Sequence, residues 1–249
     1  MIITATNYTC KSFWDGKHEY KVLQTPATNI QLVSIYKNGT CQSVLGSKNY
    51  GMNASFFNSD TNKAILNIAV QSGSSVGTGQ YVPDLRGGQV KDGTVNLIGD
   101  SVIFWNGSSL NCMNATRYSH DTRLPKAPNT WVQGGIGLYL CDQNWQNKYL
   151  AERNAAACAL DEVAARTGVL VNKSTKYVYL FACHGLIAVS ELRTAMMHYA
   201  NLTEDGSAGS WAAIMTDGGR STQLCSREGY VASAMVRDVP QIIALKNKT

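Results

Sequence analysis

The first 145 residues carry short hydrophobic runs separated by residues typical of tight turns. Alternating apolar positions stop at Lys37-Asn38-Gly39, which is typical of a β-hairpin turn. A later run contains Gly134-Gly135, a pair that indicates a close approach between two backbones. The pattern therefore predicts that this half of the chain is mostly strand. The predicted strands are residues 29–36, 52–57, 64–70, 94–105 and 131–140.

Helical spacing of apolar residues first appears in the second half of the chain. Residues 147–165 are rich in alanine and predict a helix, and a second helix is predicted over 191–200, with Ser190 as its N-cap. No linker or internal repeat divides the chain. We therefore expect one α+β domain over residues 1–249, with mixed or antiparallel β-sheets flanked by helices. The strands predicted in this half are residues 169–171, 177–183, 211–215 and parts of 230–245.

Composition narrows the class of protein. Hydrophobic residues make up 44% of the 249 positions, which is enough for a sizeable core and excludes a disordered chain. Twenty-two glycines against five prolines indicate many turns rather than a helical bundle. No apolar run approaches the roughly 20 residues that a membrane-spanning helix requires, so we expect no membrane partner.

Charge and cysteine usage bear on the partners. The net charge of +5 comes from scattered basic residues, whereas nucleic-acid-binding proteins concentrate theirs in a stripe, so we expect no nucleic acid. The excess of positive charge is equally consistent with a binding site for an anionic small molecule and with a basic surface that is simply solvated. The seven cysteines are odd in number and lack CxxC spacing, which predicts neither a complete disulfide framework nor a metal site, and no cofactor is expected. With no signal peptide visible, we expect a cytoplasmic protein, although a secreted chain or part of a larger assembly also fits.

The clearest candidate for chemistry is the segment Asp217-Gly218-Gly219-Arg220-Ser221-Thr222, which directly follows a predicted buried strand. Paired glycines let the backbone turn sharply and bring its N–H groups close to a ligand. Those N–H groups, two hydroxyls and a guanidinium suit a phosphate. The Asp217 carboxylate suits the role of acid, base or sugar-hydroxyl acceptor. The alternative is an Asx turn between two strands, in which Asp217 bonds only its own backbone.

Other segments combine with this loop into a longer pattern. Arg166-Thr167-Gly168, Phe181-Ala182-Cys183-His184-Gly185 and Glu191-Leu192 precede it, and Gly51-Met52-Asn53-Ala54-Ser55-Phe56-Phe57 stands further upstream. In this order, from about residue 53 to 224, the chain resembles the phosphodiester glycosidase family. Members of that family carry an Arg-Thr pair, a strand ending in Gly, a helix with Glu-Leu, and a buried strand leading into Asp-Gly-Gly-x-Ser-Thr. They also carry an Asn-Gly-Gly-Phe-Phe segment upstream of these motifs. No single motif is specific for the family, but the combination of all of them is.

The resemblance implies hydrolysis of the bond between a sugar anomeric carbon and a phosphate ester. Because phosphate leaves readily, the site must mainly clamp an anion and supply a carboxylate that activates water or stabilises C1. Asp217 is expected to carry the chemistry, with Glu191 and His184 as further catalytic candidates. The residues expected to bind the substrate are Asn53, Arg166, Thr167, Gly218, Gly219, Arg220, Ser221 and Thr222.

The chain also departs from the family pattern. Ala54-Ser55 stands where the family has two glycines, so the backbone there is less free to adopt positive φ. His184 replaces a common Asp and Arg220 a common Gly, which favours a more anionic, nucleotide-like substrate. Three of the candidates also have purely structural interpretations. Glu191 suits the positive end of a helix dipole, His184 suits a hydrogen-bonded structural histidine, and Asn53 suits a buried amide that bonds strand ends.

Two other classes of function fit the same residues. A remodelled site can bind and sequester a phosphorylated sugar or nucleotide without cleaving it. An adhesion or structural domain of a larger assembly would bind no such ligand. We therefore expect an anionic small molecule, a sugar or nucleotide phosphodiester, as the partner, and the oligomeric state stays open.

Overall fold

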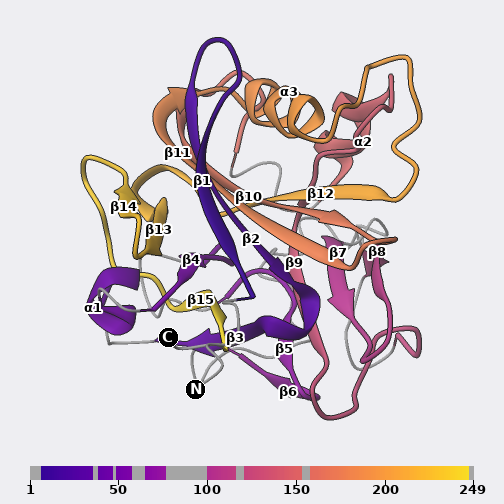
Figure 1. Cartoon of the computed structure of the whole chain (residues 1–249). Helices are drawn as coiled ribbons and strands as arrows, with labels where there is room; N and C mark the ends of the chain where they lie inside the picture. The colour runs from indigo at the N-terminus through magenta and orange to yellow at the C-terminus, as the bar shows by residue number, and fades with distance from the viewer. Residues whose placement is uncertain are drawn as a thin grey trace, which may run out of the picture.

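Two antiparallel β-sheets pack against each other, and helices α2 and α3 cover the outer face of the larger sheet (Figure 1). The computed structural model describes residues 7–35, 39–46, 49–57, 65–76, 100–115, 121–152 and 158–246. The helices are α1 (Cys41–Leu45), α2 (Trp145–Ala151) and α3 (Val189–Tyr199), with 3-10 turns η1 (Ala27–Asn29) and η3 (Gly219–Ser221). The strands are β1 (Thr9–Trp14), β2 (Glu19–Pro26), β3 (Ile30–Ser34), β4 (Gly51–Asn53), β5 (Ala69–Gln71), β6 (Ser74–Ser75), β7 (Asp100–Trp105), β8 (Leu110–Ala115), β9 (Trp131–Gly137), β10 (Ala164–Asn172), β11 (Tyr177–Ile187), β12 (Trp211–Thr216), β13 (Gln223–Ser226), β14 (Gly229–Ala232) and β15 (Gln241–Leu245).

The order of strands explains how distant segments meet. In the described residues the larger sheet runs β1-β2-β11-β10-β12-β9-β5-β6, with β7 also paired to β9 and β8 to β7. The smaller sheet runs β14-β13-β4-β15-β3. This arrangement confirms the predicted α+β class with antiparallel sheets and few helices. None of the helices in the described part of the chain is long and apolar enough to cross a membrane.

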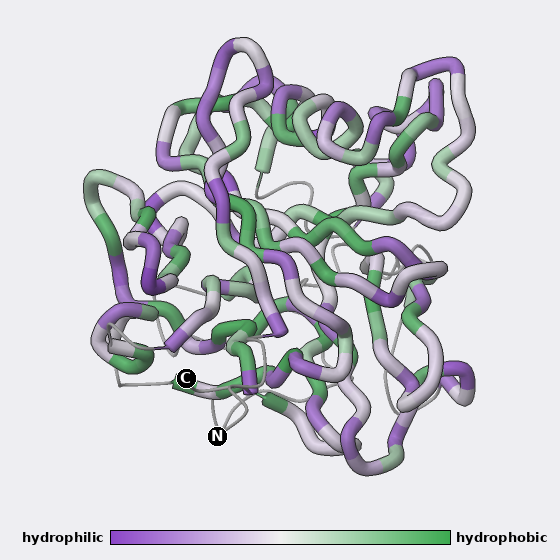
Figure 2. The backbone as a smooth tube through the Cα atoms, viewed as in Figure 1, coloured by the Kyte–Doolittle hydropathy of each residue, from purple (hydrophilic) through white to green (hydrophobic). Residues whose placement is uncertain are grey.

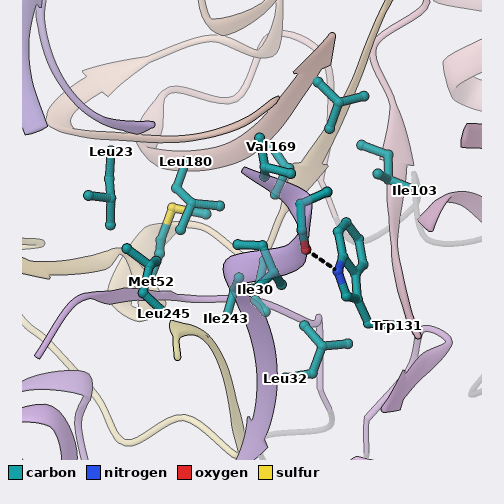
Figure 3. Close-up of a cluster of buried hydrophobic side chains, with 14 of the residues drawn as sticks. Leu23, Ile30, Leu32, Met52, Ile103, Trp131, Val169, Leu180, Ile243 and Leu245 are labelled. Atoms are coloured by element: carbon teal, nitrogen blue, oxygen red, sulfur yellow. Dashed lines mark hydrogen bonds between the residues drawn. The ribbon is translucent and has the colours of Figure 1, made fainter. Parts of the chain in front are cut away.

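The two sheets are held together by a shared apolar core (Figure 3). Val169 and Leu180 of the larger sheet pack with Met52 and Ile243 of the smaller one. Each buried side chain of this size contributes about 1.5–3 kcal/mol. Trp131 adds a directional contact, because its Nε1 donates to the carbonyl oxygen of Ala27 at 2.9 Å. That bond ties β9 to the turn between β2 and β3.

A second core fills the space between the larger sheet and the helices. Leu192 and Met196 of α3 pack in one cluster with Phe181 and Met215 from β11 and β12. Figure 2 shows hydrophobic colouring along the central strands of the larger sheet and hydrophilic colouring at the turn between β1 and β2. The central strands are therefore apolar on both faces, as expected for a sheet covered on both sides.

Several predicted strands are confirmed, and the structure corrects one turn. Strands occur within residues 29–36, 131–140 and 211–215, and around 169–171 and 177–183. The predicted hairpin after β3 is wrong, because β3 pairs with β15 and the chain enters α1 at Cys41. The strand predicted over 52–57 ends at Asn53, and the one over 64–70 starts at Ala69. Residues 94–99 of the segment 94–105 lie outside the described part of the chain.

The helix predictions need two corrections. The helix expected over 147–165 is the shorter α2, and residues from 164 onward belong to β10, while 153–157 lie outside the described residues. The chain leaves the helix at Glu152, whose buried carboxylate accepts hydrogen bonds from Ser101 of β7 and Gly137 of β9, and these contacts fix the end of α2. Helix α3 starts at Val189, and Ser190 is not its cap.

We expect Gly135→Ala to lower the free energy of unfolding by about 2–4 kcal/mol. A Cβ at this position would lie 2.4 Å from the carbonyl oxygen of Met215, which is backbone of the neighbouring β12 and can move only if the sheet distorts. Urea unfolding followed by circular dichroism measures the change. The matched control is Gly185→Ala, where a Cβ meets only side-chain atoms at ordinary contact distances. Equal midpoints for the two variants would contradict the close approach.

Candidate active site

Asp217 lies directly after β12, and its buried carboxylate is held by two other side chains. Arg237 Nη2 lies 3.2 Å from Asp217 Oδ2, and Arg237 Nε donates to Ser221 Oγ at 2.7 Å. The Ser221 hydroxyl and the Gly218 N–H also hydrogen-bond the Asp217 carboxylate. The carboxylate, guanidinium and hydroxyl therefore form a closed cycle of hydrogen bonds.

The protonation of Asp217 is set by two opposing effects. Burial raises the pKa of Asp217 to about 6, because desolvation disfavours the charged form. The Arg237 guanidinium and the bonds from Ser221 and Gly218 act in the opposite direction and limit this rise. A carboxyl group with a pKa close to neutrality is a stronger base than an ordinary aspartate and suits proton transfer.

Arg237 is the residue of the candidate site that the sequence analysis missed. It lies between β14 and β15, inside the segment 230–245 for which only strands were predicted. Its guanidinium stacks 4.5 Å above the ring of Phe57, and its backbone N–H donates to the carbonyl oxygen of Arg220 at 2.9 Å. The only sequence signal is a cation shortly before a buried strand. This contact places Phe57 of the upstream segment 51–57 beside Arg237.

The two glycines of the loop, Gly218 and Gly219, are required for different structural reasons. A Cβ on Gly218 would lie 2.8 Å from the carbonyl oxygen of Ala165, so only glycine fits against β10 at this point. Gly219 has φ +56, in the left-handed region that glycine adopts readily. Neither Ala54 nor Ser55 has positive φ, so these two side chains impose no backbone strain at this point.

Asn53 connects strand ends through both atoms of its side-chain amide. Its Nδ2 donates to the carbonyl oxygen of Asp217 at 2.6 Å, and its Oδ1 accepts from the backbone N–H of Gln223 at 2.9 Å. Thr167 Oγ1 donates to the same Asp217 carbonyl at 2.7 Å. Asn53 and Thr167 therefore hold the backbone at Asp217, and their predicted contact with substrate stays a prediction.

Arg166 is buried and bonded to groups inside the protein. Its Nη1 lies 2.6 Å from Cys158 Sγ, its Nη2 donates to the carbonyl oxygen of Glu162 at 2.5 Å, and its Nε donates to that of Ile187 at 3.3 Å. The aliphatic part of Arg166 packs beneath Gly218. In this arrangement Arg166 supports the loop from below, and its predicted role as an anion clamp requires it to exchange these partners.

The other two loop residues differ in exposure. Arg220 is exposed, and its Nε donates to the carbonyl oxygen of Met235 at 3.2 Å. Thr222 is buried, and the structure shows no hydrogen-bond partner for its Oγ1 among the described residues. A guanidinium at the surface of the loop is therefore the more accessible of the predicted phosphate contacts.

The structure does not bring Glu191 and His184 together with Asp217. Glu191 accepts from the Ala188 N–H at 2.8 Å at the start of α3 and forms an ion pair with Lys17, which lowers its pKa. His184 lines a separate hollow between the β1–β2 hairpin and β14. The placement of Glu191 agrees with its structural interpretation, whereas His184 is exposed and its interpretation as a hydrogen-bonded structural histidine stays a prediction. Their predicted catalytic roles have no geometric support.

No group of three or more metal-ligating side chains is found among the described residues. All seven cysteines belong to that part of the chain and are free thiols. Burial raises the pKa of Cys158, the thiol beside Arg166, while the guanidinium acts against this rise. At Asp217 the described side chains offer a carboxylate suited to proton transfer and a guanidinium suited to anion binding.

Comparison with solved structures shows the fold of the chain. The catalytic domain of zebrafish N-acetylglucosamine-1-phosphodiester alpha-N-acetylglucosaminidase, auto-inhibited by its pro-peptide, matches with a TM-score of 0.63 and 12% identity over 97% of this chain and 82% of that one. A hypothetical protein from Synechocystis matches with a TM-score of 0.56 and 12% identity over 96% of this chain and 61% of that one. No protein-family model and no curated protein sequence matches. The resemblance found in the motifs is therefore supported at the level of the fold.

We expect Asp217→Asn to change how stability depends on pH. The folded-state pKa of Asp217 is raised from 3.8 to about 6, so the folded chain holds a proton that the unfolded chain releases between those values. The wild type therefore loses stability as pH rises through this window, and the variant does not. Relative to wild type, the variant should gain on the order of 3 kcal/mol in free energy of unfolding between pH 4 and pH 7. A difference between the two proteins that stays constant over this range would contradict the raised pKa.

We expect Asn53→Ala to lower the free energy of unfolding by about 2–4 kcal/mol, because it removes partners from two buried backbone groups. Asn49→Ala is the matched control, since it removes one partly buried hydrogen bond to the carbonyl oxygen of Leu45 and should cost about 1 kcal/mol. Urea midpoints report both changes. Equal losses in the two variants would show that Asn53 does not join the strand ends.

Proposed function

We propose that this protein is a hydrolase that cleaves the glycosidic bond between a sugar anomeric carbon and a phosphate ester. The observation that carries the proposal is the buried Asp217 carboxylate, with a pKa of about 6, held by Arg237 and Ser221 at the end of β12. The fold is shared with the catalytic domain of a protein whose name describes cleavage of a sugar phosphodiester. The substrate class comes from the motifs and from this likeness.

The geometry suits a mechanism that needs one strong base and an anion clamp. Above pH 6 Asp217 is a carboxylate that can take the proton of an attacking water molecule. The water oxygen forms a bond to C1 of the sugar, the bond from C1 to the phosphate oxygen breaks, and its electron pair leaves with the phosphate. No proton donor is required at that oxygen, because phosphate is a good leaving group. A single carboxylate is therefore sufficient in this scheme.

Two arginines suit the leaving phosphate. Arg237 uses its Nε and Nη2 for Ser221 and Asp217, and a guanidinium carries five N–H donors, so donors remain for a ligand. Arg220 lies at the exposed side of the same loop. Two cations around one anion favour a substrate with more than one negative charge, and we therefore include nucleotides among the substrates to be tested.

A second function is a module that binds such a ligand without cleaving it. The observation that favours it is that the Asp217 carboxylate already bonds Arg237 and the Gly218 N–H, so groups of the protein itself occupy the proposed base. The two proposals share the anion site and differ only in turnover. One experiment can separate them.

We expect turnover of at least one compound in a panel of sugar-1-phosphodiesters and cyclic or linear nucleotides, read by mass spectrometry. Asp217→Asn should reduce the rate by about 10³-fold or more, because it removes the base. Asp161→Asn, an exposed aspartate, is the matched control and should retain full activity.

Reaction in ¹⁸O-labelled water identifies the bond that breaks. Label in the sugar product supports cleavage between C1 and oxygen, whereas label in the phosphate would contradict a glycosidase. If no compound is cleaved but one is recovered bound and unchanged, the protein is a sequestering module. If none is cleaved or bound, both proposals fail.

A further inference from the structure

A second hollow lies at the opposite end of β12 from Asp217. It has a volume of about 220 Å³, and its lining includes Trp211 from the start of β12, Tyr139 and Asn114. A shallower hollow of about 370 Å³ shares Asn114 and Tyr139 and extends over Asn147 of α2. Asp217 lines neither of them. The two hollows form one groove with Tyr139 at its centre, which we call the Tyr139 groove.

Tyr139 is held in an unusual backbone conformation. Its φ is +43, in the left-handed region that large side chains rarely adopt. Arg193, a buried residue of α3, donates from Nε to the carbonyl oxygen of Leu138 at 3.0 Å and from Nη2 to that of Tyr139 at 3.2 Å. Such strain persists only where surrounding contacts enforce it, and it is concentrated at ligand-binding sites.

The hydroxyl group of Tyr139 is fixed by a buried carboxylate. It donates to Glu152 Oε1 at 2.5 Å, and Glu152 is only 2% exposed. The same carboxylate accepts from the N–H and hydroxyl of Ser101, at 3.0 and 2.6 Å, and from the Gly137 N–H at 2.9 Å. Asn114 Nδ2 lies 3.3 Å from the Tyr139 oxygen as a donor. The phenol and its amide neighbour are therefore preorganised at the wall of the groove.

The charges around the groove argue against an anionic ligand. Lys148 and Asp142 form an ion pair at its rim, and the Lys148 ammonium lies 5.8 Å from the centre of the Tyr139 ring. The Glu152 carboxylate lies behind Tyr139 and has no Lys or Arg partner among the described residues. Arg123, which donates to the carbonyl oxygen of Asn114, is likewise paired, with Asp121. Among the described residues a phosphate in the groove would therefore meet cations that already have carboxylate partners.

We propose that the Tyr139 groove binds a neutral sugar. Aromatic rings at Trp211 and Tyr139 provide surfaces against which the C–H face of a pyranose packs, and the amides of Asn114, Asn144 and Asn147 provide both donors and acceptors for its hydroxyl groups. The site is independent of the proposed hydrolase function, because it shares no lining residue with the Asp217 site.

Saturation-transfer NMR tests this site with the methyl glycosides of glucose, galactose and N-acetylglucosamine. At least one glycoside should receive saturation from the wild-type protein, whereas inorganic phosphate should not compete with it. The double variant Asn114→Ala/Asn147→Ala should weaken binding by about tenfold or more, since it removes two side chains that hydrogen-bond the ligand. Both residues are exposed, so the variant should keep the wild-type unfolding midpoint.

Two controls locate the binding. Gln146→Ala changes an exposed residue of α2 outside the groove and should bind as the wild type does. Asp217→Asn should also bind normally, which separates this site from the proposed active site. The proposal is overturned if no neutral glycoside binds at millimolar concentration, if the double variant binds as well as wild type, or if phosphate displaces the sugar.

Discussion

The candidate active site depends on the buried side-chain amide of Asn53, which connects the two sheets by hydrogen bonds. This residue belongs to β4 of the smaller sheet, yet it bonds the backbone of Asp217 at the end of β12 in the larger sheet and of Gln223 at the start of β13. The backbone N–H of Asp217 adds a further bond between the sheets by donating to the carbonyl oxygen of Ala54. Because all of these groups are shielded from water, each unmade bond would be costly. The position of the catalytic candidate is therefore set by a strand 164 positions away.

Much of the fold could be predicted because many strands are determined by local patterns of apolar and turn-forming residues. Strands such as β9, β10 and β12 are apolar runs bounded by turn residues, and Asn172 turns the chain between β10 and β11 by accepting bonds from Ser174 and Thr175 N–H groups. The pairing of β3 with β15 could not be predicted, since no local signal couples residues so far apart. The short α2 illustrates the same limit, because alanine content favours helix while distant hydrogen bonds to Glu152 end it.

In the candidate site, too, features set by adjacent residues could be predicted from the sequence, whereas contacts between distant residues could not. Asp217 and its two glycines could be identified because close packing and positive φ leave a readable signature in adjacent residues. Arg237 could not, since it approaches Asp217 only through the fold. Glu191 and His184 stand at suggestive places in the sequence, but helix α3 holds Glu191 beside Lys17 and strand β11 holds His184 at a separate hollow. Motifs thus identified the loop, while the identity of its charged partner depended on three-dimensional structure.

The place of β15 in the smaller sheet has a consequence for how the molecule is assembled. It is inserted between β4 and β3, so these two early strands have no contact with each other through the sheet until residues 241–245 arrive. During synthesis on a ribosome, both strands present unpaired edges for most of the chain's length, and such edges invite pairing with other chains. Folding must wait for these long-range contacts, which are slow to form. The protein is thus expected to mature late and to rely on protection of those edges while it is being made.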